Sequence, residues 1–131
     1  MHALRNIHAA LADDGILVDT QPVSASPPVA SDGGELGTLD MHDWLETIHA
    51  VDERFAETIA AGLYELEHES RFIVTDSFDN GPECLDIVSG WCGTRVPLGV
   101  SQRLAAATSP VTVEQEVRLR LLRRAPLPAY A

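Results

Sequence analysis

The beginning of the chain constrains the fold most, because it predicts a helix, a turn and a strand in immediate succession. Leu4, Ile7 and Leu11 recur at the spacing of one helix face. Gly15 follows two aspartates and breaks that helix, and residues 16–19 then read as a short buried strand. Such a unit normally lies inside an α/β domain, with strands on either side of it, rather than at its start.

The rest of the chain predicts one long helix and a pair of long strands. Residues 41–61 carry an apolar side chain at every third or fourth position, which is typical of an amphipathic helix. Residues 111–122 alternate apolar and polar side chains, which predicts an antiparallel strand with one solvated face, and we expect it to pair with residues 66–75. Shorter helices are predicted at 82–90 and 100–107. The expected fold class is therefore α/β, with a sheet of about three strands: one short buried strand and a long antiparallel pair, with helices packed on it.

Length and composition predict a single domain over residues 1–131. A chain of 131 residues, 45% of them hydrophobic, can bury a core without a structural metal ion or disulfide bonds. Residues 21–34 are rich in Pro, Ser and Gly and predict a long loop, while 35–39 could add a short strand. We expect the tail at 125–131 to be frayed.

Charge and residue usage exclude several classes of function. The net charge is −11 and lysine is absent, which excludes a lysine Schiff base and argues against binding nucleic acid or an anionic membrane. No apolar run is long enough to span a bilayer, and no secretory signal pattern is present, so we expect a cytoplasmic protein.

The sequence predicts no metal site. Cys84 and Cys92 have neither a redox nor a zinc spacing, and we expect two reduced thiols. His42 and His49 lie two turns apart on one predicted helix, too far apart to share a metal ion without ligands from a second element.

The opening unit and the last strand together resemble the C-terminal half of class I S-adenosylmethionine-dependent methyltransferases. Residues 3–11 are similar to the helix that precedes a glycine turn in that family, and residues 11–15 (Leu-Ala-Asp-Asp-Gly) stand in place of its Leu-x-Pro-Gly-Gly. Residues 16–19 resemble the strand that follows, and 111–122 would be the family's late antiparallel strand, inserted into the sheet. The resemblance implies a partial, Rossmann-like sheet, with residue 1 about midway through the fold.

The family's cofactor-binding features are missing from this chain. Members of the family hold the cofactor with a glycine-rich turn after the first strand and an acidic residue after the second, and no GxGxxG or GxGxG pattern occurs here. The resemblance therefore implies a methyltransferase-like protein or fragment of unknown substrate, without autonomous binding of S-adenosylmethionine or catalysis. The cofactor would bind only if an upstream half supplied its site.

Two places are candidates for a substrate pocket. Asp19, Thr20 and Gln21 follow the first predicted strand, at the edge where open α/β sheets bind ligands. The alternative is that they only cap a loop. Trp91 and Arg95 lie in an unusual glycine-containing segment and are of residue types enriched at binding surfaces. The alternative for Trp91 is that its ring packs in the core beside a tight turn.

A partial sheet leaves an edge that another chain can pair with. We therefore expect a homodimer or a heteromeric partner that covers the edge near residues 16–18. Two functions remain as alternatives to the interpretation as a methyltransferase-like protein. One is a non-enzymatic dimerisation or partner-interaction module, and the other is a small-ligand-binding protein that uses a pocket near residues 19–22.

Overall fold

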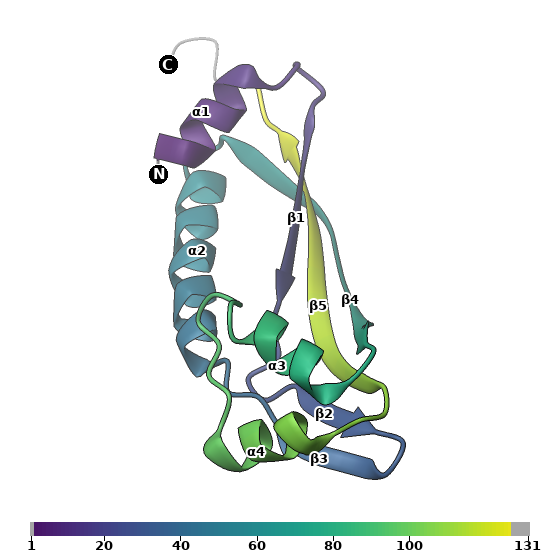
Figure 1. Cartoon of the computed structure of the whole chain (residues 1–131). Helices are drawn as coiled ribbons and strands as arrows, with labels where there is room; N and C mark the ends of the chain where they lie inside the picture. Colours follow the sequence, from purple (N-terminus) through teal and green to yellow (C-terminus); the bar gives the residue numbers. More distant parts are fainter. Residues whose placement is uncertain (1, 127–131) are drawn as a thin grey trace. The chain divides into compact units, whose positions relative to one another are not determined.

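The computed structural model describes residues 2–126 of the chain (Figure 1). In chain order its elements are α1 (His2–Ala10), β1 (Ile16–Pro22), β2 (Pro28–Ser31), β3 (Gly34–Thr38), α2 (His42–Ala60), β4 (Tyr64–Phe78), α3 (Gly81–Val88), α4 (Leu98–Ala106) and β5 (Val111–Arg124). The protein is thus α/β, as expected. Within the described residues, every helix is too short or too polar to cross a membrane.

An antiparallel sheet of five strands forms around β5. β5 pairs with β1, β2 and β4, and β3 pairs with β2. Two backbone hydrogen bonds give the direction of β1 relative to β5, because Arg124 donates to Gly15 while Val23 donates to Glu116. Figure 1 shows β5 running between β1 and β4.

The sheet has five strands instead of the expected three or so because residues 21–34 are not one long loop. This segment contains β2 and the turn into β3, and Ser31 pairs with Gly34 across a two-residue connection. Asp32-Gly33 in that connection is a strong hairpin signal. Gly34 has a φ of 116°, which favours glycine. Val29 is fully buried and pairs with Val113, which anchors the hairpin to β5.

β1 is not the buried strand that its apolar run predicted. It stands at the end of the strand order, and Ile16 and Val18 are 43% and 56% exposed. Asp19 is the one β1 residue that is buried, with 7% of its surface exposed. A short apolar run occurs both in strands that are buried on two faces and in strands that are buried on one face. The sequence therefore could not show which of these β1 is.

Contacts divide the chain into two compact units, and the boundaries fall within β1, α2, β4 and β5. The first unit consists of Met1–Gln21, Ile48–Arg71 and Arg118–Ala131. The second consists of Pro22–Thr47 and Phe72–Val117.

The core of the first unit gathers side chains from α2, β4 and β5. Phe55, Leu63, Tyr64 and Leu122 are buried together, and Leu4 of α1 packs against them. The Tyr64 hydroxyl donates to the Leu4 carbonyl at 2.6 Å, which ties α1 to the core.

Ala125, the residue that follows β5, makes contacts within the first unit. Ala125 is buried, and its N–H donates to the Leu63 carbonyl at 2.9 Å. Its carbonyl lies 3.1 Å from Nε2 of His8, whose ring packs edge-on against Tyr64. The prediction of a frayed tail covers residues 125–131, of which residues 127–131 lie outside the described part of the chain.

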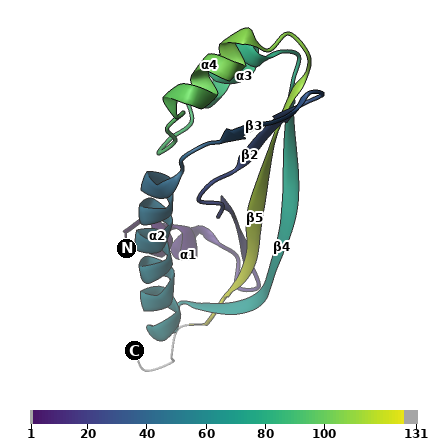
Figure 2. The same ribbon diagram turned by 90° about the horizontal axis from the view of Figure 1, so that it is seen from below.

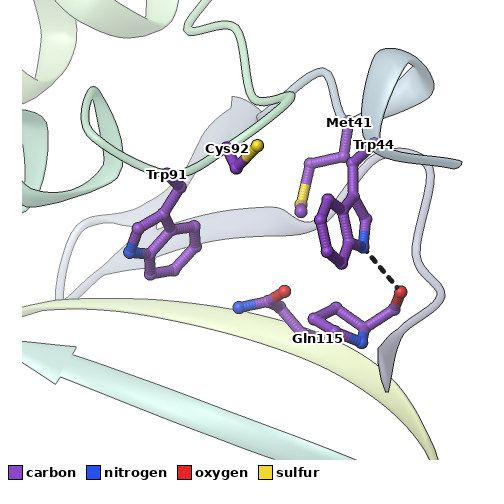
Figure 3. A pocket seen from close by; sticks show the side chains of 6 residues that line it. Met41, Trp44, Trp91, Cys92 and Gln115 are labelled. Carbon is purple, nitrogen blue, oxygen red and sulfur yellow. Dashed lines mark hydrogen bonds between the residues drawn. The ribbon is translucent and has the colours of Figure 1, made fainter. Parts of the chain in front are cut away.

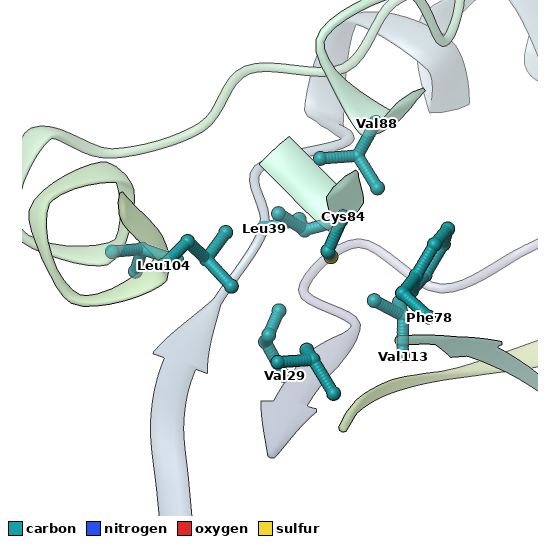
Figure 4. Packing of buried hydrophobic residues seen from close by; sticks show 9 residues of the cluster. Val29, Leu39, Phe78, Cys84, Val88, Leu104 and Val113 are labelled. Carbon is teal, nitrogen blue, oxygen red and sulfur yellow. The ribbon is translucent and has the colours of Figure 1, made fainter. Parts of the chain in front are cut away.

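The core of the second unit lies between the hairpin, β5 and helices α3 and α4 (Figure 4). Val29, Leu39, Val88, Leu104 and Val113 have at most 1% of their surface exposed. α3 and α4 pack against each other, and they overlap in the view of Figure 2. They approach so closely at the start of α3 that a Cβ on Gly81 would lie 1.9 Å from a backbone oxygen of α4.

Candidate functional site

The structure places the residues predicted for a substrate pocket in different units. Asp19, Thr20 and Gln21 belong to the first unit, and Trp91 and Arg95 to the second. Thr20 is exposed, and Arg95 is exposed in an ion pair with a carboxylate at the start of α2.

In the first unit, Asp19 belongs to a cluster of two carboxylates and two guanidinium groups. Arg118 donates two hydrogen bonds to Asp52, at 2.8 and 3.0 Å. Arg120 donates to Asp52 at 2.8 Å and to Asp19 at 3.2 and 3.3 Å. Gln21 donates to the other oxygen of Asp19 at 3.0 Å. β1, α2 and β5 thus each contribute to one network of charges.

The charged groups of this cluster pair with one another, with Glu69 a further carboxylate 3.9 Å from Arg118, and they are not arranged as an acid–base pair. Burial by itself would raise the pKa of Asp52, but hydrogen bonds and charge from Arg118 and Arg120 outweigh burial and lower it. The hydrogen bond to Asp52 likewise raises the pKa of Arg118. Both groups therefore stay charged near neutral pH, and a structural role fits them better than proton transfer.

A groove of about 340 Å³ lies beside this cluster in the first unit. Its lining is mainly apolar, with Leu4, Leu17, Val51 and Phe55 along it and Asp19 and Gln21 at one side. The groove thus brings two of the three predicted β1 residues to one surface.

In the second unit, a smaller pocket is built around two indole rings (Figure 3). Its volume is about 260 Å³, and it is lined by Pro22, Met41, Trp44, Trp91, Cys92 and Gln115. Met41 immediately precedes α2 and Trp44 lies in its first turn, while Trp91 and Cys92 come from the segment after α3 and Gln115 from β5.

Hydrogen bonds hold Trp44 in place on its side of the pocket. Its indole Nε1 donates to the Pro22 carbonyl at 3.0 Å, and its backbone N–H donates to the Gly93 carbonyl at 3.2 Å. Gly93 has a φ of 66°, and a Cβ there would lie 2.7 Å from the Trp44 backbone. Only glycine lets the segment after Trp91 approach the helix this closely.

The floor of this pocket carries a buried amide with an unused acceptor. Gln115 is 7% exposed, and its Nε2 donates to Asp76 at 3.2 Å. A carboxylate only accepts hydrogen bonds, so this contact fixes which end of the amide is nitrogen. The opposite atom, Oε1, is buried and has no hydrogen-bond partner among the described residues. Figure 3 shows the amide between Trp91 and Trp44.

Of the residues that line this pocket, the sequence indicates Trp91 alone as a candidate for binding. Trp44 falls within the helix expected at 41–61 and carries no separate signal. Gln115 carried a signal that could have been used, because it is the one polar residue on the apolar face of the predicted strand 111–122. Asp76, its partner, lies on β4 and gave no local signal.

The two thiols of the second unit differ in their surroundings. Burial, together with the nearby charge of Glu83, raises the pKa of Cys84 to about 11. Cys92 is exposed. Within residues 2–126, no group of three or more His, Cys, Asp or Glu side chains is placed to hold a metal ion.

Comparison with known proteins adds no assignment. No family model, curated protein or solved structure matches the chain.

Proposed function

We propose that this chain is a methyltransferase-like protein that carries the substrate-side half of a Rossmann-like fold and does not bind S-adenosylmethionine by itself. The observation that supports this proposal is the position of β5. The last strand of the chain pairs with β1 on one side and with β4 on the other, and it runs antiparallel to β1. An inserted late antiparallel strand, after a helix–glycine–strand unit, is the arrangement that the sequence resemblance implies.

The groove of the first unit is the place for the methyl acceptor in this proposal. In open α/β sheets, ligands bind at the carboxyl ends of strands, and Asp19 and Gln21 lie toward that end of β1. Leu17 and Phe55 provide apolar surface beside them. The acceptor would therefore combine an apolar body with a polar group that faces β1.

Calorimetric titration with S-adenosylmethionine tests the cofactor part of the proposal. The chain alone should give only heats of dilution, because it has no glycine-rich turn to approach the cofactor. Binding with micromolar affinity would contradict the proposal. A protein extended by an in-frame upstream segment with a glycine-rich strand–turn–helix should bind the cofactor, and failure of that protein to bind would contradict the methyltransferase assignment.

A second function, homodimerisation through the β1 edge, is favoured by the exposure of that strand. β1 stands at the end of the strand order and presents Ile16 and Val18 to solvent. An exposed apolar edge strand is a template for pairing with another chain. In this alternative a second copy of the chain covers the edge.

Light scattering after size-exclusion chromatography tests this alternative at tens of micromolar protein. A dimer should have twice the mass of the 14.2 kDa chain. Val18→Lys should convert it to a monomer, because a lysine on an edge strand opposes pairing. Ile73→Lys, an equally β-branched and exposed position on β4, is the matched control and should stay dimeric. A monomeric wild-type chain would refute homodimerisation.

A further inference from the structure

We propose that the pocket in the second unit binds a small, uncharged planar heterocycle, whose ring lies against Trp44 and Trp91 and whose N–H donates to Oε1 of Gln115. This inference does not rest on the methyltransferase proposal, and it concerns residues that the proposal leaves unused.

The unpartnered oxygen of Gln115 indicates that the ligand is a hydrogen-bond donor. Buried polar atoms nearly always have a partner, and a buried acceptor without one destabilises the protein. The contact with Asp76 keeps Oε1 turned away from that carboxylate, so the amide cannot relieve the mismatch by rotating. Donation to Asp76 also polarises the amide, which strengthens Oε1 as an acceptor. A ligand N–H would complete this chain of hydrogen bonds.

The tryptophans indicate that the ligand is flat and aromatic. Indole faces stack well on planar rings, with a gain beyond the buried area alone. Trp44 is already oriented by its hydrogen bond to the Pro22 carbonyl, so the ring needs no rearrangement to receive a ligand. Because its N–H is used in that bond, Trp44 offers the ligand a surface and no donor.

Size and charge narrow the ligand class further. The pocket volume of about 260 Å³ lies below the usual range for drug-sized ligands, ~300–1,000 Å³, and suits one ring or two fused rings. None of the six lining residues is an Asp, Glu, Lys, Arg or His. A charged ligand would lose its hydration without gaining an ion pair, so a neutral heterocycle fits best.

Benzimidazole and 1-methylbenzimidazole are the probes for this proposal, because they share a ring system and differ in the N–H. Both tryptophans of the chain line the pocket, so tryptophan emission excited beyond the tyrosine band reports on this site. Benzimidazole should change that emission in a saturable way. It should bind about five- to tenfold more tightly than the methylated probe, since one hydrogen bond separates them. Equal affinities, or no saturable change with either probe, would overturn the proposal.

Two matched variants locate the hydrogen bond. Gln115→Met should bind both probes with the same affinity, because it retains the side-chain size and lacks the acceptor. Gln102→Met is the control, since Gln102 is an exposed residue of α4 that does not line the pocket. The control should retain the wild-type preference. A preference that survives in Gln115→Met would refute the assignment of the acceptor.

Alkylation of Cys92 gives a readout that needs no variant. Cys92 is exposed and lines the pocket, whereas Cys84 is buried elsewhere in the same unit. Saturating benzimidazole should slow the modification of Cys92 at least severalfold, and 1-methylbenzimidazole at the same concentration should protect it less. Unchanged alkylation of Cys92 under saturating benzimidazole would show that the probe binds elsewhere. Neither readout depends on S-adenosylmethionine, so failure here and failure of the methyltransferase proposal are separate results.

Discussion

Replacement of Arg118 by methionine should destabilise the protein strongly, because Arg118 is a buried cation that stabilises the charged carboxylate of Asp52. Its side chain is 8% exposed and donates two hydrogen bonds to Asp52. Methionine has a similar length and fills the apolar part of the space. The substitution therefore removes mainly the charge and its hydrogen bonds.

The expected cost follows from what Asp52 retains after the substitution. Removal of one partner from a buried ion pair costs about 3–5 kcal/mol. Asp52 is 33% exposed and keeps its contact with Arg120, so water and the second guanidinium recover part of that cost. We expect a loss of about 2–3 kcal/mol in the free energy of unfolding. With an entropy of unfolding of about 2.1 cal/mol/K per residue, a chain of 131 residues would lose about 7–11 °C in Tm.

Urea and thermal unfolding followed by circular dichroism measure this loss. Arg123→Met is the matched control on the same strand, because Arg123 pairs with Glu67 on an exposed surface. Exposed ion pairs contribute little to stability, so the control should change the midpoint far less.

Two results would refute the reasoning about Arg118. One is an Arg118→Met variant whose midpoint is no lower than that of the Arg123→Met control. The other comes from the double variant with Asp52→Leu. If the cost arises from a stranded carboxylate, removing that carboxylate should restore part of the stability. Additive losses in the double variant would show that the two side chains do not act as a pair.

Three further predictions follow from burial, close packing and charge. Maleimide should modify Cys92 rapidly and Cys84 only on unfolding, because Cys84 is buried with a pKa of about 11. Mass spectrometry of the digested protein distinguishes the two cysteines, and early labelling of Cys84 would contradict its burial. Gly81→Ala should lower the free energy of unfolding in urea by about 3 kcal/mol or more, because its Cβ would lie 1.9 Å from a backbone oxygen. Gly90→Ala, whose Cβ would have its nearest contact at 3.5 Å, should lower it far less. Equal losses in the two variants would contradict the close approach of α3 and α4. Because the folded-state pKa of Asp52 is lowered from 3.8, its stabilising contribution is complete above that pH range and is lost as pH falls through the folded-state pKa. Asp52→Asn should therefore be less stable at neutral pH, with a shallower loss in acid, and an unchanged acid profile by circular dichroism would contradict this.

Local signals in the sequence predicted most of the helices and strands. The helix expected at 41–61 is α2, His42–Ala60, because an apolar stripe defines its length and Gly62, with a φ of 77°, ends it. The strand expected at 111–122 is β5, and its alternation identified it as antiparallel. These features depend on residues near one another in the chain, which is why pattern reasoning finds them.

The candidate site was only partly predictable, because its chemistry comes from residues far apart in the chain. Trp91 and Trp44 reach one pocket from different elements, and Gln115 depends on Asp76 from another strand. An alternating pattern marks Gln115 as unusual on its face, but it cannot tell that the Gln115 oxygen is left unpartnered.

The sequence by itself determined where most of the chain is helical or extended, and that it carries a net charge of −11. Only the tertiary structure decided which strands are edges and which charges are buried. The sequence of β1 predicts a buried strand, yet β1 stands at the end of the strand order. The alternating pattern places Arg118 on a solvated face, yet its side chain is buried and hydrogen-bonded to Asp52. The physical reason is that burial is a property of what packs against a residue. The opening helix–turn–strand unit is therefore real as local structure, while the exposure of its strand is set by neighbours that its own residues do not specify.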